Sequence, residues 1–248
     1  MRITMSIGQM KEIVGNLNVL VDEVTLNFTK EGMDFRVVDV SHVCMLSAQF
    51  PAESFEVFDC EESSIAVEVR TLVELVKGSK TNDRISIEWD NESTHLNVTK
   101  GFLGLLSKSV LKLERSGSPM VPDLLLPTVI TVGAEWFEMA IKHASDVSCL
   151  AKFSAIKHED RMTDLFSIIG SNESEEISIG AEIVIDVEAN TTFSMTYLKP
   201  MSKRIRMTAG KDEHITLMFG DSQPLVINFA SSTGEYSYFL APRIDGDI

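Results

Sequence analysis

The chain reads Thr71-Leu-Val-Glu-Leu-Val-Lys-Gly78, then Ile85-Ser-Ile-Glu-Trp89 and His95-Leu-Asn-Val98, and the pattern returns in Tyr197-Leu-Lys-Pro-Met-Ser-Lys203, Ile215-Thr-Leu-Met-Phe219 and Leu225-Val-Ile-Asn-Phe229. Each copy is a segment with helical spacing followed by two short strand-like runs. Ile85 and Ile215 occupy the same place in the two copies and are 130 residues apart (215 − 85) in a chain of 248. A repeat of this length predicts two similar domains rather than a stack of short repeats.

The first part of each half also predicts a helix followed by strands. Apolar residues recur with helical spacing in the segments 9–21 and 135–144, which gives each helix one buried stripe. Period-two stretches follow at 24–28 and 33–37, and at 152–156 and 165–168. With two helices and many short strands in each half, we expect an α+β protein made of two similar domains of antiparallel sheet.

The two domains are expected at residues 1–115 and 129–248, joined by a connecting loop at 116–128. The loop begins Ser116-Gly-Ser-Pro-Met-Val-Pro-Asp123, and its glycine and two prolines interrupt regular structure. Its apolar residues Met120, Val121 and Leu124 to Leu126 are open to two interpretations: packing that joins the domains, or an exposed docking surface.

Composition narrows the class of protein. Hydrophobic residues make up 44% of the chain and charged residues 24%, without a run of eighteen apolar residues, so each half can bury a core. The N-terminal residues read as a strand and not as a secretory signal, so we expect a cytoplasmic protein. Cys44, Cys60 and Cys149 lack metal-ligand spacing, and we expect neither a metal nor another cofactor.

Catalysis is not expected. None of the five histidines has metal-ligand spacing, and no nucleophile elbow, phosphate-binding loop or dinucleotide fingerprint is present. Two acidic groups could be considered as catalytic carboxylate clusters: Asp160 with Asp164, and Glu173 with Glu175 and Glu176. In so acidic a chain, residues of solvated loops are the simpler interpretation. The sequence therefore predicts a protein that acts by binding.

The charge is unevenly distributed. A net charge of −15 and a pI near 4.7 would by themselves oppose binding to nucleic acid. Positive residues nevertheless gather on the predicted helices, where Lys199 and Lys203 are four residues apart and share a face. For any one of these lysines, the solvated face of an amphipathic helix is the simpler interpretation. A basic surface on an acidic protein is the alternative.

The C-terminal segment Phe239-Leu-Ala-Pro-Arg-Ile244 resembles the end of sliding clamps of the proliferating cell nuclear antigen family, in its archaeal form. Val38-Asp-Val-Ser-His-Val43, Gly32 and Gln223-Pro-Leu-Val-Ile227 agree with it. The resemblance spans the chain and implies a DNA-clamp fold, with three subunits in a ring around duplex DNA. It implies a processivity factor for DNA replication and repair that tethers a DNA polymerase, a clamp loader, a flap nuclease and a ligase through short peptide motifs. The alternative is a subunit of a heterotrimeric clamp that works only with paralogous partners.

The resemblance also assigns residues to DNA. The family's basic inner helices correspond to stretches that begin at Gln9, Arg70, Glu135 and Leu198. The implied DNA contacts are Lys11, Lys77, Lys80, Lys142, His143, Lys199, Lys203, Arg204 and Arg206. Glu74 and Glu138 stand where relatives are commonly basic, so a weaker inner field is expected.

Two further surfaces follow from the resemblance. The pocket for partner peptides would comprise Val38, His42, Val43, Met45, Val121, Pro122, Pro224, Phe239, Leu240, Ala241, Pro242, Arg243 and Ile244. Subunits would join through edge strands at Leu105–Leu113 and Glu176–Glu182. The implied interface residues are Lys108, Ser109, Val110, Leu111, Ile177 and Ile179. Both stretches could equally be interior strands of their own domains.

Overall fold

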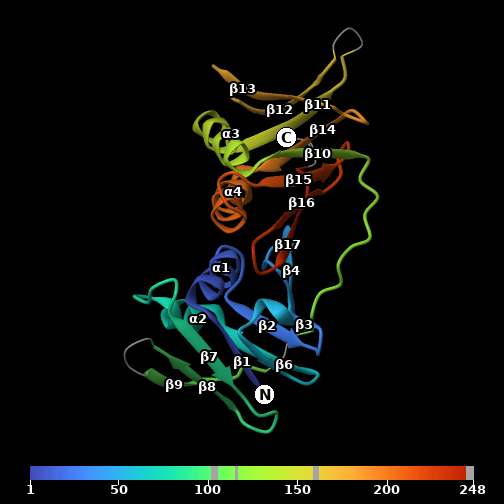
Figure 1. Ribbon diagram of the computed structural model, residues 1–248. Helices are drawn as coiled ribbons and strands as arrows, with labels where there is room; N and C mark the ends of the chain where they lie inside the picture. Colours follow the sequence, from blue (N-terminus) through green and yellow to red (C-terminus); the bar gives the residue numbers. More distant parts are fainter. Residues whose placement is uncertain (102–105, 115–116, 159–161, 244–248) are drawn as a thin grey trace. The chain divides into compact units, whose positions relative to one another are not determined.

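The protein is described by a computed structural model that covers residues 1–101, 106–114, 117–158 and 162–243 (Figure 1). The chain forms two compact units. The first contains Met1–Val121 together with Ser232–Tyr236, and the second contains Pro122–Ser231 and the segment from Ser237 onward. Residues 117–127 form neither helix nor strand.

The two units share one order of elements, except that the first has an additional short strand, β5 (Val57–Asp59), and a 3-10 turn. The first contains β1 (Arg2–Ser6), α1 (Ile7–Leu17), β2 (Glu23–Phe28), β3 (Gly32–Val38), β4 (Cys44–Pro51), a short 3-10 turn (Ala52–Ser54), β5 (Val57–Asp59), β6 (Ser63–Glu68), α2 (Val69–Val76), β7 (Arg84–Glu88), β8 (His95–Lys100) and β9 (Leu106–Leu111). The second contains β10 (Thr128–Gly133), α3 (Ala134–Val147), β11 (Leu150–Ile156), β12 (Asp164–Ser171), β13 (Glu176–Ile183), β14 (Ala189–Ser194), α4 (Met195–Ala209), β15 (His214–Phe219), β16 (Leu225–Ala230) and most of β17 (Glu235–Leu240), whose first two residues belong to the first unit.

Strand pairing confirms the predicted α+β fold with its internal repeat. In the first unit β1 pairs antiparallel with β7 and places Met5 opposite Ile85. In the second unit β10 pairs with β15 and places Val132 opposite Ile215. The residues that align in the sequence repeat, Ile85 and Ile215, therefore occupy equivalent positions in the two sheets.

Each unit contains a second set of antiparallel strands. In the first unit β6-β2-β3-β4 are neighbours in that order, and in the second unit the order is β14-β11-β12-β13. Helix α3 lies against β12 and β13 and beside α4, while α1 lies beside α2 (Figure 1).

The helices form where the apolar spacing predicts them. Ser6 caps α1 by accepting a hydrogen bond from the Gln9 N–H at 3.0 Å, and the helix buries Ile7, Met10 and Ile13. The expected helix at 9–21 ends earlier, at Leu17, because the Leu20 and Val21 N–H groups turn back to the Leu17 carbonyl. Among the residues described, no helix is both long and apolar enough to cross a membrane.

Aromatic side chains fill both cores. In the first unit, Phe28 and Trp89 have ring centroids 4.6 Å apart. In the second unit, Phe153 is fully buried and lies within 5.2–6.4 Å of four other rings, which belong to Phe137, Phe166, Phe193 and Phe219. Edge-on contacts of this kind stabilise a core beyond simple burial. Each unit can therefore hold its own helices in place.

Candidate nucleic-acid interface and docking surfaces

Helix α4 carries the densest group of predicted DNA contacts. It buries Leu198, Met201 and Ile205 on one face. Lys199 and Lys203 are exposed on the other face, and Arg204 is half-buried. Within the described residues, none of these three cations forms an ion pair. The structure thus brings Lys199 and Lys203 together on one solvent-facing side, as their spacing predicts.

Arg206, at the end of α4, has a different environment. Its Nε is paired with the Glu138 carboxylate of α3, and both side chains are about a third exposed or less. The neighbouring Glu135 of α3 pairs with Lys211 at 3.6 Å. The sequence predicts Arg206 as a DNA contact and Glu138 as a separate weakening charge, but in the folded unit the two neutralise each other.

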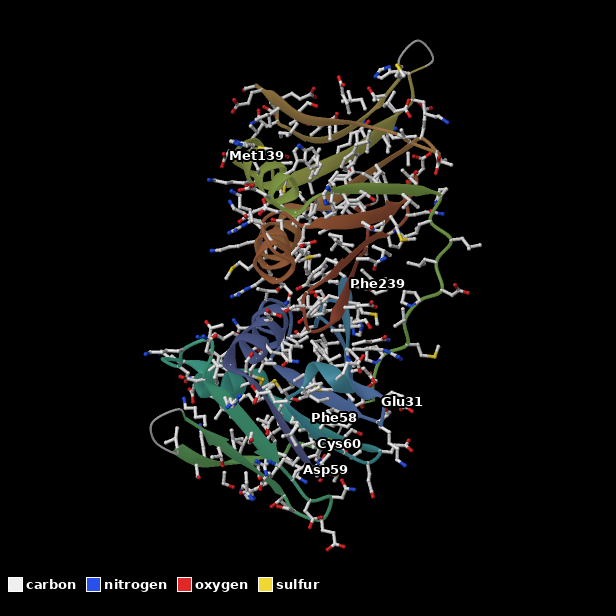
Figure 2. The ribbon with its side chains drawn as sticks, in the orientation of Figure 1. Glu31, Phe58, Asp59, Cys60, Met139 and Phe239 are labelled. Carbon is white, nitrogen blue, oxygen red and sulfur yellow. The ribbon has the colours of Figure 1, made fainter. Side chains whose placement is uncertain are left out.

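The outer side of α3 is mixed. Lys142 and His143 are exposed beside Met139, which projects from the helix (Figure 2). A shallow groove here is lined by Trp136 and Met139 together with charged neighbours. The sequence does not reveal this apolar strip, because helical spacing assigns Trp136 to the core, where it contacts Phe166 at 5.8 Å.

The first unit keeps fewer unengaged cations on its helices. Lys11 of α1 is half-buried and donates to the Ser79 carbonyl at 2.6 Å. On α2, Arg70 lies 3.8 Å from Glu74, which also lies 3.9 Å from Lys108 of β9. Lys77 and Lys80 are exposed and follow the last residue of α2. The expectation of one common positive bias on four helices is therefore too simple.

The loop after β3 holds several predicted peptide contacts in a defined conformation. The buried carboxylate of Asp39 accepts hydrogen bonds from the N–H groups of Ser41, Val43 and Cys44 at 2.7–3.0 Å. His42 has a φ of 56°, which is uncommon for a residue other than glycine. Val38 and Val43 are half-buried, whereas His42 is exposed. Asp39 is thus a positioning residue for this loop that the sequence motif does not single out.

At the end of β17 the predicted peptide contacts differ in exposure. Phe239 (Figure 2), Ala241 and Pro242 are half-buried, and Arg243 is exposed. The Arg243 N–H donates to the Thr192 carbonyl at 2.7 Å, which anchors the segment to β14. Leu240 has no exposed surface, so its side chain is part of the core. Ile244 lies outside the described residues.

The other predicted peptide contacts lie on loops or at a strand end. Val121 is 41% exposed, and Pro122 is also exposed. Pro224 is half-buried just before β16, and Met45 is buried in β4. The solvent-facing members of the predicted set are therefore His42, Val121, Pro122 and Arg243.

The predicted subunit interface residues lie on strands at sheet edges. β9 is last in the order β5-β1-β7-β8-β9, and β13 is first in the order β13-β12-β11-β14. Leu111 of β9 is 56% exposed, and Ile177 and Ile179 of β13 are half-buried. The interior-strand alternative is wrong for β9 and β13; Leu105, the first residue of the predicted edge, lies outside the described residues.

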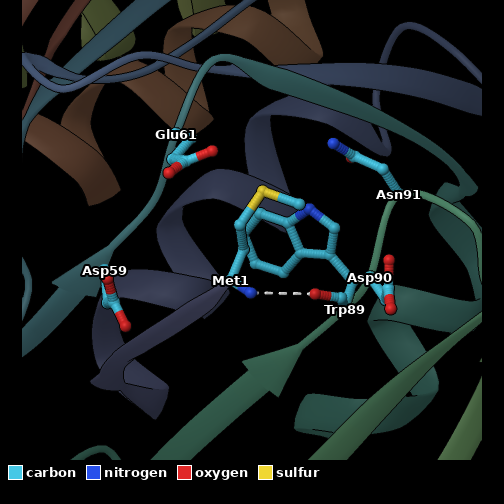
Figure 3. Close-up of a pocket in the computed structure, with 6 residues that line it drawn as sticks. All are labelled: Met1, Asp59, Glu61, Trp89, Asp90 and Asn91. Atoms are coloured by element: carbon cyan, nitrogen blue, oxygen red, sulfur yellow. Dashed lines mark hydrogen bonds between the residues drawn. The ribbon is translucent and has the colours of Figure 1, made fainter.

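A further pocket in the first unit belongs to none of the predicted surfaces. Met1, Asp59, Glu61, Trp89, Asp90 and Asn91 line it (Figure 3). The Met1 ammonium donates to the Trp89 carbonyl at 2.9 Å. Among the described residues, no group of three or more histidine, cysteine or acidic side chains is arranged to hold a metal ion.

Known proteins match both the sequence and the fold. The model of the proliferating cell nuclear antigen N-terminal domain matches residues 4–102. The DNA polymerase sliding clamp of Archaeoglobus fulgidus is 30% identical over 249 residues, with 96% of each chain covered. That of Methanosarcina mazei is 28% identical over 247 residues, again with 96% of each chain covered.

Solved structures agree. The A. fulgidus clamp, solved with the C-terminal region of FEN-1 bound, superposes with a TM-score of 0.87 at 26% identity, covering 99% of each chain. The Thermococcus kodakaraensis clamp has a TM-score of 0.86 at 18% identity, covering 98% of this chain and 99% of its own, and shows the likeness of fold. Two similar antiparallel units with two helices each define the DNA-clamp fold. The chain belongs to the proliferating cell nuclear antigen family of DNA polymerase sliding clamps.

Proposed function

We propose that three copies of this chain close into a ring around duplex DNA and tether replication and repair proteins to it. The observation that carries the proposal is that β9 and β13, one strand from each unit, both lie at the edge of a sheet. Edge strands expose unpaired N–H and C=O groups that pair readily with another chain. Two different edges on one chain permit a head-to-tail contact, which forms a ring if the rotation closes.

The side chains on these edges support a contact between copies. Val110 lies opposite the buried Leu96, so Leu106, Lys108 and Val110 of β9 share the core-facing side. Ile179 lies opposite the buried Ile168, so Ile177, Ile179 and Ile183 of β13 share the core-facing side. Pairing β9 with β13 of another copy would cover exposed Leu106 of β9 and half-buried Ile177 and Ile179 of β13. Lys108, Ser109, Val110, Leu111, Ile177 and Ile179 are the proposed interface residues.

Inside the ring, DNA would be held by enclosure and by weak contacts to phosphate. The proposed contacts are Lys77, Lys80, Lys142, His143, Lys199, Lys203 and Arg204, with Lys11 and Arg206 less available because both are engaged within the protein. Such contacts are independent of base sequence and weaken with salt. This suits a protein that must slide, and no catalytic step is part of the proposal.

A second surface would receive peptides from a polymerase, clamp loader, flap nuclease or ligase. The proposed contacts are Val38, His42, Val43, Met45 and Val121 from the first unit, and Pro122, Pro224, Phe239, Ala241, Pro242 and Arg243 from the second. The bound FEN-1 region of the A. fulgidus clamp supports a peptide mode of binding. We further propose domain limits of 1–115 and 129–248, a connecting loop at 116–128, and action in the cytoplasm.

Light scattering over a concentration and salt series tests the ring. A mass near three times the 27.5 kDa chain is expected. A monomer at all concentrations would contradict self-assembly and would favour the alternative, a subunit that closes only with paralogous partners.

A further inference from the structure

The four described helices differ sharply in charge. Helix α4 contains Lys199, Lys203, Arg204 and Arg206 without an acidic residue. Helix α1 contains one lysine and one glutamate, and α2 contains one arginine and one glutamate. Helix α3 contains Lys142 against Glu135, Glu138 and Asp146. Of these four helices, only α4 therefore has a net positive charge from its lysines, arginines and acids.

The contacts sharpen this difference. Arg70 is engaged with Glu74, and Lys11 with a backbone carbonyl. On α4, Arg206 alone is neutralised among the described residues, by Glu138. The turn that carries Lys77 and Lys80 also holds the acidic Asp83, whose carboxylate accepts a hydrogen bond from the backbone N–H of Lys80 at 2.9 Å. Lys199 and Lys203 remain as exposed lysines on one helix face, with half-buried Arg204 beside them.

We propose that α4 is the principal DNA-contacting element, so that each subunit holds the phosphate backbone mainly through Lys199, Lys203 and Arg204. The inference rests on the proposed function and narrows it: the second unit binds DNA, while the helices of the first unit are close to neutral. A ring would then present one basic helix per subunit, and few phosphate contacts favour sliding over tight binding.

The consequence is measurable in the salt dependence of binding. The slope of log K against log salt becomes shallower by about 0.9 for each phosphate of B-form DNA that the protein no longer neutralises. We would titrate a fluorescein-labelled duplex with the wild-type protein, with Lys199→Gln/Lys203→Gln, and with the matched pair Lys77→Gln/Lys80→Gln. Each double variant removes two exposed lysines. Lys199 and Lys203 belong to the second unit, and Lys77 and Lys80 belong to the first.

The proposal expects the slope of the Lys199→Gln/Lys203→Gln variant to be shallower by at least about one unit, and the slope of the Lys77→Gln/Lys80→Gln variant to change by clearly less. It is overturned if the first-unit pair changes the slope as much as the α4 pair, or if the α4 pair leaves it unchanged. Those results leave the proposed clamp function standing, provided that the ring mass is retained. A wild-type ring without salt-dependent binding to duplex DNA would overturn both.

Discussion

Arg206 of α4 and Glu138 of α3 form an ion pair that joins the two helices of the second unit. The pair is only partly exposed, and 68 residues of sequence separate its members. It removes one positive charge from the end of the most basic helix. If α4 binds DNA as proposed, Glu138 therefore limits the contribution of Arg206 to that binding.

Changing Glu138 to Gln should release the Arg206 guanidinium and strengthen DNA binding at low salt. If Arg206 then reaches a phosphate, the salt slope steepens by about 0.9 for each new contact. Because isolated, partly exposed ion pairs contribute about 0–1 kcal/mol, stability should fall only slightly.

Asp146→Asn is the matched control, because it removes the same charge from α3 and Asp146 makes no ion pair among the residues described. Equal effects of the two variants on duplex titrations would mean that only net charge matters, and that the pair does not restrain Arg206.

Changing Ile179 to Asp should weaken ring formation without unfolding the unit. The charge would replace a half-buried apolar side chain on the edge strand β13. A free-energy cost of about 1.4 kcal/mol per interface corresponds to a tenfold weaker association, and a charge in an apolar contact should cost at least that. Light scattering at decreasing concentration would detect the earlier dissociation.

Ile156→Asp provides the comparison, because Ile156 is 43% exposed on β11, which lies between β12 and β14. If both variants dissociate at the same concentration, β13 is not part of the interface between subunits.

Changing Val121 to Asp should weaken binding of a peptide from the C-terminal region of FEN-1, the segment solved with the A. fulgidus clamp. Val121 is 41% exposed, so the fold tolerates the change. Placing a charge at a docking residue that lies near apolar anchors should weaken the affinity about tenfold or more. Calorimetry with Val129→Asp as control is suitable, because Val129 is 43% exposed outside the proposed surface. Unchanged peptide affinity of the Val121→Asp variant would exclude the connecting loop from the peptide-binding surface.

Changing Asp39 to Ala should open the loop that carries His42 and Val43. Three N–H groups would be deprived of a charged acceptor, at a cost of about 3 kcal/mol in unfolding free energy. Burial, with a smaller effect of the Asp39 charge, raises the pKa of the Cys44 thiol to about 12. Cys44 is therefore a protonated, buried thiol at neutral pH and should resist alkylation.

Mass spectrometry after brief iodoacetamide treatment at pH 8 reports on this loop. In the wild type, exposed Cys149 should react well before Cys44, and Asp39→Ala should accelerate the reaction of Cys44. The control variant Asp22→Ala changes an exposed aspartate and should leave the reaction of Cys44 slow. Rapid labelling of Cys44 in the wild type would contradict the closed loop.

The fold could be predicted from the sequence because the repeat and the apolar periodicity are local signals. Ile85 and Ile215 align in sequence and occupy equivalent positions in the two sheets. The burial of Leu240 could also be predicted from the sequence, because Tyr236, Tyr238 and Leu240 recur at every second position of a strand. The resemblance of the C-terminal segment to sliding clamps instead predicts Leu240 as a peptide contact.

The state of individual charges could not be predicted, because it depends on which helices become neighbours. Glu138 meets Arg206, and Lys11 reaches the carbonyl of Ser79, only after the chain has folded. The edge position of β9 and β13 was also open, since an edge strand and an interior strand can share one period-two pattern.

Retention on DNA of different topology tests the central claim, enclosure of duplex by a ring, most directly. The protein would be concentrated with nicked circular duplex so that rings close around it, then separated from free protein by gel filtration at high salt. Enclosure predicts retention on the circle and release once a restriction enzyme linearises it. Equal retention on circular and linear DNA would show that affinity alone holds the protein, and would contradict the clamp account.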